Sequence, residues 1–378
     1  MSKDSKVNTA VLLPWLKLGC DLQMGKYFFL RWPREDSKFG EFAQSLNSIC
    51  GMYKYIDGGV ESPQTIITDN SHPRFERVEV QERQAFQEVV TILTTSLIGE
   101  NEFFSNFGNY VNSSLTELHF QNFSLGEDLV AFTSYKRDGY TTDMGYEFSE
   151  ITVSVPPGCR TRTECKGIDQ AWLDALGKTL EKNTSLDRLI IEASNLFCQA
   201  NTDSPNVLQT TEVVMLANAF DRLFPSANGR YKLSEAISKE LDKWVTISMK
   251  DSKRMAERQI VPSQIDSKCT GEWDIIRSWI LELYVLRNSY VHGEDITQHK
   301  WGWTPNEHLL MGAYVFPLLL KVLISKEKRY ELTEEDVYKL LAIDGLLDLN
   351  EFYDKKNHKS LWREKLNEVR LHTRLGNN

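Results

Sequence analysis

Three residues near position 290 have side chains that could together act on a phosphate ester. Arg287, Asn288 and His292 fall within about one and a half helical turns, in the segment 287–293 with the sequence RNSYVHG. Histidine titrates near neutral pH and can exchange protons with a hydroxyl group. The arginine guanidinium stays charged and matches the oxygens of a phosphate. These residue types suit RNA cleavage without a metal ion, in which the ribose 2′-hydroxyl attacks the adjacent phosphate.

The segment that carries these residues has the pattern of an amphipathic helix over 273–291. Its apolar residues recur three and four positions apart: Ile276, Trp279, Ile280, Leu283, Leu286 and Tyr290. Gly293 follows, and glycine suits the left-handed conformation that ends many helices. Asn288 and His292 are four apart and share a face. Arg287 and His292 differ by about 140° around the axis, so their convergence needs long side chains or a second copy of the helix.

Simpler roles for the same residues remain open. Arg287 could pair with Glu282 or Glu294, and His292 could interact with the carbonyl groups of the last helical turn. The six cysteines are scattered without zinc-site spacing, and the sequence contains no glycine-rich phosphate loop. We therefore expect no cofactor and no metal. His299 and His308 flank a tryptophan-rich loop and are expected to be structural.

Residues 1–157 are expected to form a mixed α+β domain. Two strands joined near Met24-Gly25 fit 11–32, a helix fits 79–98, and strand-like runs cover 115–123, 128–135 and 146–155. Pro156-Pro157-Gly158 is the best candidate for a linker.

After that linker the apolar period becomes helical. Six helices of a bundle are expected at 170–182, 185–200, 209–224, 234–249, 273–291 and 307–324. The sequence thus predicts an all-α domain over 158–330. A helical extension over 331–378 follows, with helices at 333–341 and 359–372.

Composition excludes several classes of protein. Of 378 residues, 41% are hydrophobic and 26% are charged, as in an ordinary globular chain. The net charge of −9 excludes a wholly basic nucleic-acid coat protein but not a local basic groove. The polar N-terminus lacks the apolar core of a signal peptide, and the apolar stretch 311–324 is shorter than a membrane span. We expect a cytoplasmic protein that does not contact a membrane.

The pattern Arg287-Asn288-x3-His292-Gly293 resembles the Arg-x4-6-His signature of HEPN domains, which favour a polar residue straight after the arginine. The segments 186–201 and 211–224 resemble the Apea-like HEPN branch. The second of these commonly carries an acidic residue, and Asp221 stands at the matching position. The resemblance covers roughly residues 165–325.

This resemblance implies a fold and an activity. HEPN domains are all-helical, pair through the helices that bear the motif, and place two Arg–His sets in one composite cleft. Many are metal-independent endoribonucleases of antiphage, toxin–antitoxin and abortive-infection systems. By this resemblance Arg287 and His292 are catalytic, with Asn288 and Asp221 in support. The substrate is RNA, the assembly a homodimer, and the N-terminal domain a sensor or regulator for a phage-derived trigger.

Two alternatives of other classes are open. The first is a non-catalytic HEPN-type protein that binds RNA or a partner and scaffolds a defence complex. The second is a metal-dependent nuclease in the N-terminal part, where Asp57, Glu61, Asp69 and Glu76 supply carboxylates without a recognisable pattern. Sensitivity of RNA cleavage to EDTA would favour the second.

Overall fold

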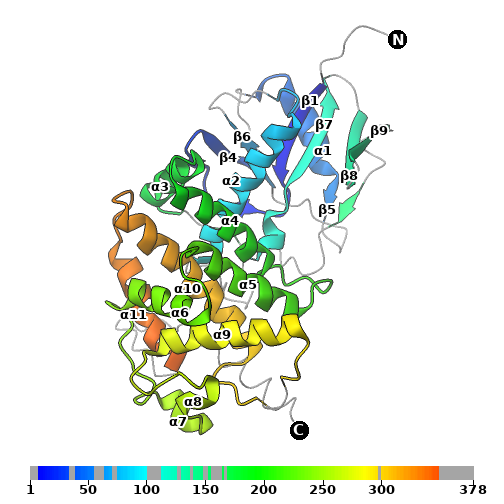
Figure 1. Cartoon of the computed structure of the whole chain (residues 1–378). Helices are drawn as coiled ribbons and strands as arrows, with labels where there is room; N and C mark the ends of the chain where they lie inside the picture. Colours follow the sequence, from blue (N-terminus) through cyan, green and yellow to red (C-terminus); the bar gives the residue numbers. More distant parts are fainter. Residues whose placement is uncertain are drawn as a thin grey trace. The chain divides into compact units, whose positions relative to one another are not determined.

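The chain forms two compact units (Figure 1). The computed structural model describes residues 7–33, 39–54, 64–69, 75–99, 112–125, 129–136, 139–147, 152–154, 164–165, 168–296 and 299–348. The first unit comprises Met1–Lys182 with Asp203–Pro205, and the second comprises Asn183–Thr202 with Asn206–Asn378. The division thus falls after Lys182, whereas the sequence prediction began the helical domain at residue 158. The expected linker at 156–158 lies outside the described residues.

A seven-stranded antiparallel sheet organises the first unit. Its strands, in spatial order, are β3 (Leu22–Met24), β4 (Tyr27–Trp32), β6 (Gln64–Thr68), β1 (Val7–Leu13), β7 (His119–Ser124), β8 (Leu129–Lys136) and β9 (Gly139–Glu147). The central strand β1 is almost entirely buried, and its Val11 pairs with Ile67 on one side and Phe120 on the other. Two short parallel pairs join β5 (Tyr53–Lys54) to β10 (Val153–Ser154) and β2 (Lys17–Leu18) to β11 (Glu164–Cys165).

Several predicted elements of this unit are confirmed. The hairpin β3–β4 turns after Met24, where Gly25 has a φ of 59° that favours glycine. Helix α2 (Val80–Gly99) matches the predicted helix at 79–98. The 115–123 run is split between a 3-10 turn, η3 (Ser113–Thr116), and β7.

Two sequence interpretations of the first unit were wrong or incomplete. The one strand expected at 146–155 covers the end of β9, which begins at Gly139 and pairs along its length with β8, and the separate short strand β10. Residues 148–151 between them lie outside the described residues. Helix α1 (Phe42–Gly51) was not predicted. It is ten residues long, and its buried residues Ser45, Leu46, Ile49 and Cys50 recur at helical spacing, but no side-chain cap marks its start.

Helix α3 (Gln170–Leu180) belongs to the first unit. Its Trp172 indole donates a hydrogen bond to Ser96 Oγ on α2 over 3.1 Å. Gly177 lies against the β3–β4 turn so closely that a Cβ there would stand 2.5 Å from the Gly25 nitrogen. A helical period alone does not reveal on which core a helix packs, and α3 packs on the sheet unit.

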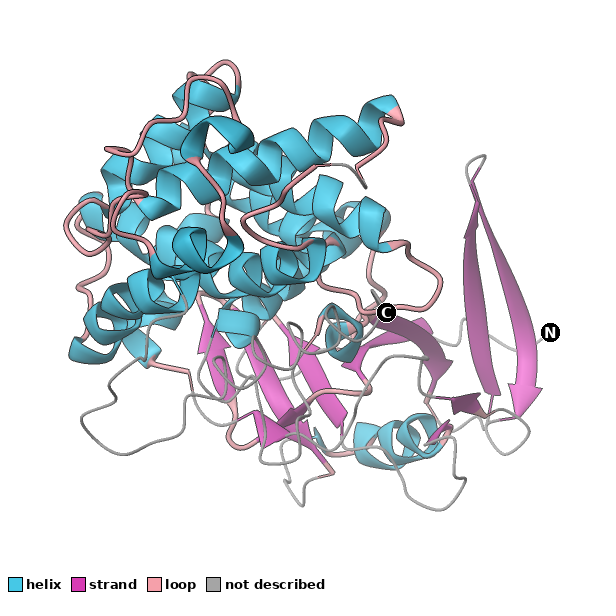
Figure 2. Ribbon diagram, turned by 90° about the horizontal axis from the view of Figure 1, so that it is seen from below, coloured by secondary structure: helices cyan, strands magenta, loops and turns pink. Residues whose placement is uncertain are grey.

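The second unit is helical. Its helices are α4 (Ser185–Gln199), α5 (Gln209–Leu223), α6 (Arg230–Leu241), α7 (Lys253–Arg258), α8 (Pro262–Ile265), α9 (Ile275–His292), α10 (Pro305–Lys326) and α11 (Glu334–Asp348). Every strand that the structure describes lies before residue 166, and Figure 2 distinguishes the strands (magenta) from the helices (cyan). The predicted α+β class with a helical C-terminal part is confirmed.

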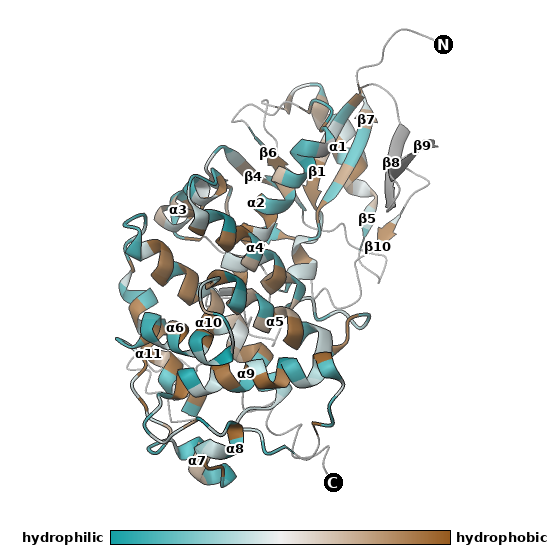
Figure 3. Ribbon diagram, in the orientation of Figure 1, coloured by the Kyte–Doolittle hydropathy of each residue, from teal (hydrophilic) through white to brown (hydrophobic). Residues whose placement is uncertain are grey.

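An aromatic cluster joins four of these helices. Phe197 of α4 stacks on Phe316 of α10 with ring centroids 4.5 Å apart. Phe316 also meets Phe220 of α5 edge-on at 5.4 Å, and Phe220 meets Trp279 of α9 at 5.8 Å. In Figure 3 the ribbons of α5 and α9 alternate between apolar and polar colours, as expected for helices with one face in a core. This cluster holds α5 beside α9.

The boundaries in the second unit differ from the prediction in three places. Helix α6 runs over 230–241 rather than 234–249, because a turn at 242–244 ends it. The chain after that turn is held by contacts outside the helix: Ser248 bridges to Asp274, and the Asp344 carboxylate accepts from the Ile247 nitrogen. The polar stretch 251–271 contains α7 and α8, which are short and begin at Lys253 and Pro262. Helix α11 extends beyond 333–341, and the helix expected at 359–372 lies outside the described residues.

By length and composition, α10 is the one helix among the described residues that could cross a bilayer. Its apolar window is 83% buried inside the protein, as in the core helix of a bundle. The helix continues through Pro317, so that residue does not interrupt the apolar stretch.

Candidate active site

Helix α9 holds Arg287, Asn288 and His292 in its last two turns. At its start the Asp274 carboxylate accepts a hydrogen bond from the Arg277 nitrogen over 2.7 Å. At its end Gly293 has a φ of 69°, which confirms the predicted left-handed stop. Just inside that stop, Ser289 Oγ donates to Glu294 Oε2 over 2.9 Å. Caps at both ends therefore fix the position of the three candidate residues along the helix.

The Arg287 guanidinium is held by two amide oxygens. Its Nη1 donates to Asn288 Oδ1 over 2.8 Å, and its Nε donates to Asn218 Oδ1 of α5 over 3.3 Å. The Tyr284 ring lies beneath it, with 5.4 Å between the guanidinium carbon and the ring centroid. Figure 1 shows α5 beside α9, which is how the chain brings Asn218 to this position. The structure thus joins Arg287 and Asn288, as their adjacency suggested, and adds Asn218.

Asp221 lies on α5 beside the same guanidinium. Partial burial raises the pKa of its carboxyl group, and the opposing attraction of Arg287 lowers it by less, so the net shift is upward. The structure therefore places Asp221 within the electrostatic reach of Arg287.

His292 is exposed on the last turn of α9. In the part of the chain that the structure describes, it makes no hydrogen bond or ion pair with Arg287, Asn288 or Asp221. One chain therefore provides a fixed guanidinium and an imidazole open to solvent on the same helix end, without bringing them into contact.

The two carboxylates that the sequence offered as partners of Arg287 are engaged elsewhere. Glu282 accepts hydrogen bonds from the backbone nitrogens of Gly302 and Trp303 over 2.8 and 2.7 Å, and Glu294 accepts from Ser289. The simple ion pair is therefore not what positions Arg287.

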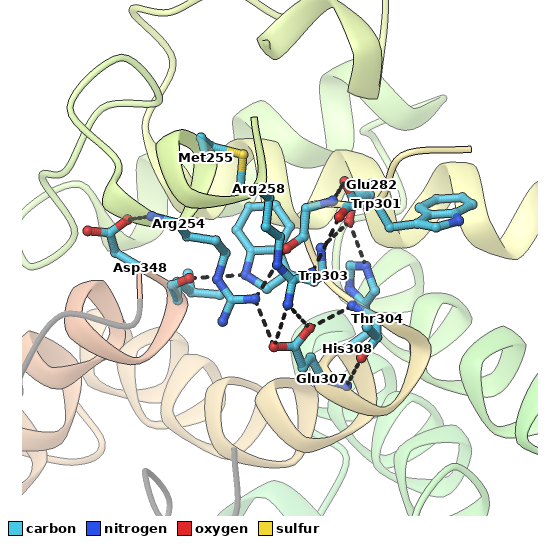
Figure 4. A network of polar contacts seen from close by, with 12 residues as sticks. Arg254, Met255, Arg258, Glu282, Trp301, Trp303, Thr304, Glu307, His308 and Asp348 are labelled. Carbon is cyan, nitrogen blue, oxygen red and sulfur yellow. Dashed lines mark hydrogen bonds and ion pairs between the residues drawn. The ribbon is translucent and has the colours of Figure 1, made fainter. Parts of the chain in front are cut away.

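Glu282 belongs to a buried polar network that fixes the loop after α9 (Figure 4). Its Oε1 lies 3.3 Å from His308 Nε2, and both side chains are fully buried. Beside them, Arg254 and Arg258 each lie 2.9 Å from a carboxylate oxygen of Glu307. Because His308 has no access to solvent, it cannot reach a substrate, and its structural role agrees with the sequence interpretation.

His119, a histidine of the first unit, has partners that were not expected from the sequence. His119 Nε2 lies 3.6 Å from Glu117 Oε1, and His119 Nδ1 lies 3.2 Å from the Tyr53 hydroxyl. Alternating residues share a face of an extended segment, and this two-residue spacing was the available signal. The pKa of Glu117 is lowered chiefly by its interaction with His119.

The described residues contain no group of three histidine, cysteine or acidic side chains that could hold a metal ion. Of the four carboxylates considered for a metal-dependent nuclease, Asp69 and Glu76 are exposed, and Asp57 and Glu61 lie outside the described residues.

Comparison with known proteins gives no relative for this chain: no protein-family model, curated protein or solved structure matches it. The candidate site therefore stands on its own residues.

Proposed function

We propose that this protein is a metal-independent endoribonuclease of the HEPN type. The observation that carries the proposal is the end of α9, where a guanidinium held by neutral oxygens lies one to two turns from an exposed histidine. A fixed positive charge and a titratable imidazole are the two groups that phosphodiester cleavage by an internal hydroxyl requires.

In the proposed reaction, the ribose 2′-oxygen attacks the adjacent phosphorus and the bond to the 5′-oxygen breaks. His292 takes the proton of the 2′-hydroxyl or gives a proton to the leaving oxygen. Arg287 stabilises the additional negative charge on the phosphate oxygens. The products are a 2′,3′-cyclic phosphate and a 5′-hydroxyl, so no water or metal ion enters the bond-breaking step.

We also propose that the active form is a homodimer. The reaction needs both a base and an acid, and one exposed imidazole cannot fill both roles in a concerted step. Two copies of α9 side by side would supply two histidines and two arginines to one cleft. Sedimentation of the purified protein, followed by RNA cleavage in mixtures of Arg287→Ala and His292→Ala chains, tests this arrangement.

The decisive test of the proposed function compares variants on total RNA with and without EDTA. We expect His292→Ala to lower the cleavage rate by about 10²–10⁴-fold and Arg287→Ala by about 10²–10³-fold, with the fold unchanged. His299→Ala, a change to a partly exposed histidine outside the site, serves as the matched control and should retain activity. Intact but retarded RNA with the wild-type protein would instead favour the non-catalytic scaffold.

In this proposal the first unit senses a phage-derived trigger and controls the nuclease in antiphage defence. Host growth then provides a second readout. Expression of the wild-type chain during infection should arrest growth, whereas the His292→Ala chain should not.

A further inference from the structure

Asn218 accepts the one hydrogen bond from the Arg287 guanidinium, among the described residues, that crosses to another helix. Asp221 of the same helix α5 acts on the guanidinium electrostatically, without a hydrogen bond or ion pair. Asn288 and Tyr284 are on the same helix as Arg287 and would move with it. The 3.3 Å hydrogen bond from Arg287 Nε to Asn218 Oδ1 spans 69 positions of sequence and ties the guanidinium to α5. Phe220 anchors α5 in the aromatic cluster, so this bond fixes the position of the Arg287 guanidinium relative to the core of the unit.

Both acceptors are neutral amides. A carboxylate in either place would form a stronger, charge-assisted pair with Arg287 and would offset its charge. The amide oxygens orient the guanidinium without a direct ion pair, so that Asp221 is the acidic group that acts on its charge, from beyond hydrogen-bond distance. Two of its five N–H groups are used in this way, which leaves an edge with donors for the oxygens of a phosphate.

We propose that Asn218 is a positioning residue of the candidate site, holding Arg287 through a neutral oxygen so that the guanidinium is oriented yet keeps its charge for a phosphodiester. The part that concerns the phosphodiester rests on the proposed function. The part that concerns the orientation of Arg287 does not.

Two substitutions separate orientation from charge. Asn218→Ala removes the acceptor, so Arg287 keeps its charge but loses the hydrogen bond that ties it to α5. Asn218→Asp keeps an oxygen at nearly the same place but adds a negative charge, so the guanidinium stays ordered and is partly neutralised. Asn195→Ala is the matched control, because Asn195 is an exposed asparagine on the neighbouring helix α4.

The first readout is solvent exchange of the Arg287 Nε–H group in the full-length protein labelled with ¹⁵N-arginine. The signal is assigned by its loss in Arg287→Lys. We expect exchange to speed up several-fold in Asn218→Ala and to stay slow in Asn218→Asp and Asn195→Ala. Unchanged exchange in a folded Asn218→Ala protein would overturn the proposal, whether or not the wild-type protein cleaves RNA.

The second readout is RNA cleavage. Misplacing a catalytic group by about 1 Å can cost about 10²-fold in rate, so we expect kcat to fall by about tenfold to hundredfold in Asn218→Ala with KM nearly unchanged. Asn218→Asp should be impaired at least as much despite its ordered arginine. Full activity of Asn218→Asp would show that neutrality is unimportant and would overturn that half of the proposal. If the wild-type protein cleaves no RNA, the proposed function fails, and the exchange measurement still decides the orientation.

Discussion

Glu307 lies fully buried between two guanidinium groups and couples the stability of the second unit to pH. Burial by itself would raise the pKa of this carboxyl group. The charges of Arg254 and Arg258 outweigh burial and lower the pKa from 4.5 to about 2. A carboxylate whose pKa is lower in the folded state stabilises the fold above its unfolded pKa. That contribution is lost as pH falls from about 4.5 towards 2.

This shift predicts a specific pH dependence. The lowering of the Glu307 pKa from 4.5 to about 2 corresponds to on the order of 3 kcal/mol of unfolding free energy at neutral pH. We expect Glu307→Gln to destabilise the protein by about 2 kcal/mol less at pH 3 than at pH 7, as measured by urea unfolding at both pH values. Glu331→Gln, at an exposed glutamate, is the control. An equal loss of stability for Glu307→Gln at the two pH values would contradict the prediction.

At the scale of single residues, the sequence could indicate the candidate site only in part. Arg287, Asn288 and His292 are close in sequence, so their type and spacing were visible along one helix. Asn218 was not visible, because it meets Arg287 only after α5 and α9 pack together. Glu282 was considered as a partner of Arg287, and it instead accepts hydrogen bonds from the loop at 302–303, a contact that depends on tertiary structure.

At the scale of elements, the close approach of α3 to the β3–β4 turn gives a clear prediction. A methyl group on Gly177 would lie 2.5 Å from the nitrogen and 2.8 Å from the Cα of Gly25, and backbone atoms cannot move aside easily. We expect Gly177→Ala to destabilise the first unit by about 1–3 kcal/mol, despite the better helix propensity of alanine. Urea unfolding measures this change.

Gly51→Ala is the matched control for that substitution. Gly51 is the last residue of α1 in the first unit, whereas Gly177 lies inside α3. Outside its own helix and its chain neighbours, no described atom lies within 4 Å of the position that a Cβ at Gly51 would take. Its substitution should leave stability unchanged or raise it slightly. A Gly177→Ala protein as stable as Gly51→Ala would show that α3 can shift away from the turn.

The elements that were predicted well are helices whose sequence carries both a helical spacing of apolar residues and a residue that marks one helix end. Helix α9 has an apolar stripe and ends at Gly293, and α10 has a Thr304 cap and Pro305 at its start. Helix α1 has a short helical period but no side-chain cap, and the β9 strand was misplaced because its register is set by pairing with β8. Local patterns thus predict elements with strong caps, whereas pairing partners decide the others.

At the scale of the whole molecule, the division after Lys182 predicts which fragments can fold. Helix α3 buries Trp172, Leu173 and Leu176, and its contacts through Trp172 and Gly177 are with the first unit. A fragment 183–378 leaves α3 out. A fragment 158–378 begins at the boundary expected from the sequence and carries α3 away from the surface that covers it. It therefore exposes a face that includes a tryptophan and two leucines.

We therefore expect the two fragments to behave differently in solution. The 183–378 fragment should elute as a single species in size-exclusion chromatography and unfold cooperatively on heating. The 158–378 fragment should aggregate, because an exposed contiguous apolar face favours association. Replacing Trp172 and Leu176 by serine in the longer fragment should restore its solubility, since the same face then becomes polar. A soluble, unmodified 158–378 fragment together with an insoluble 183–378 fragment would show that α3 completes the helical unit instead.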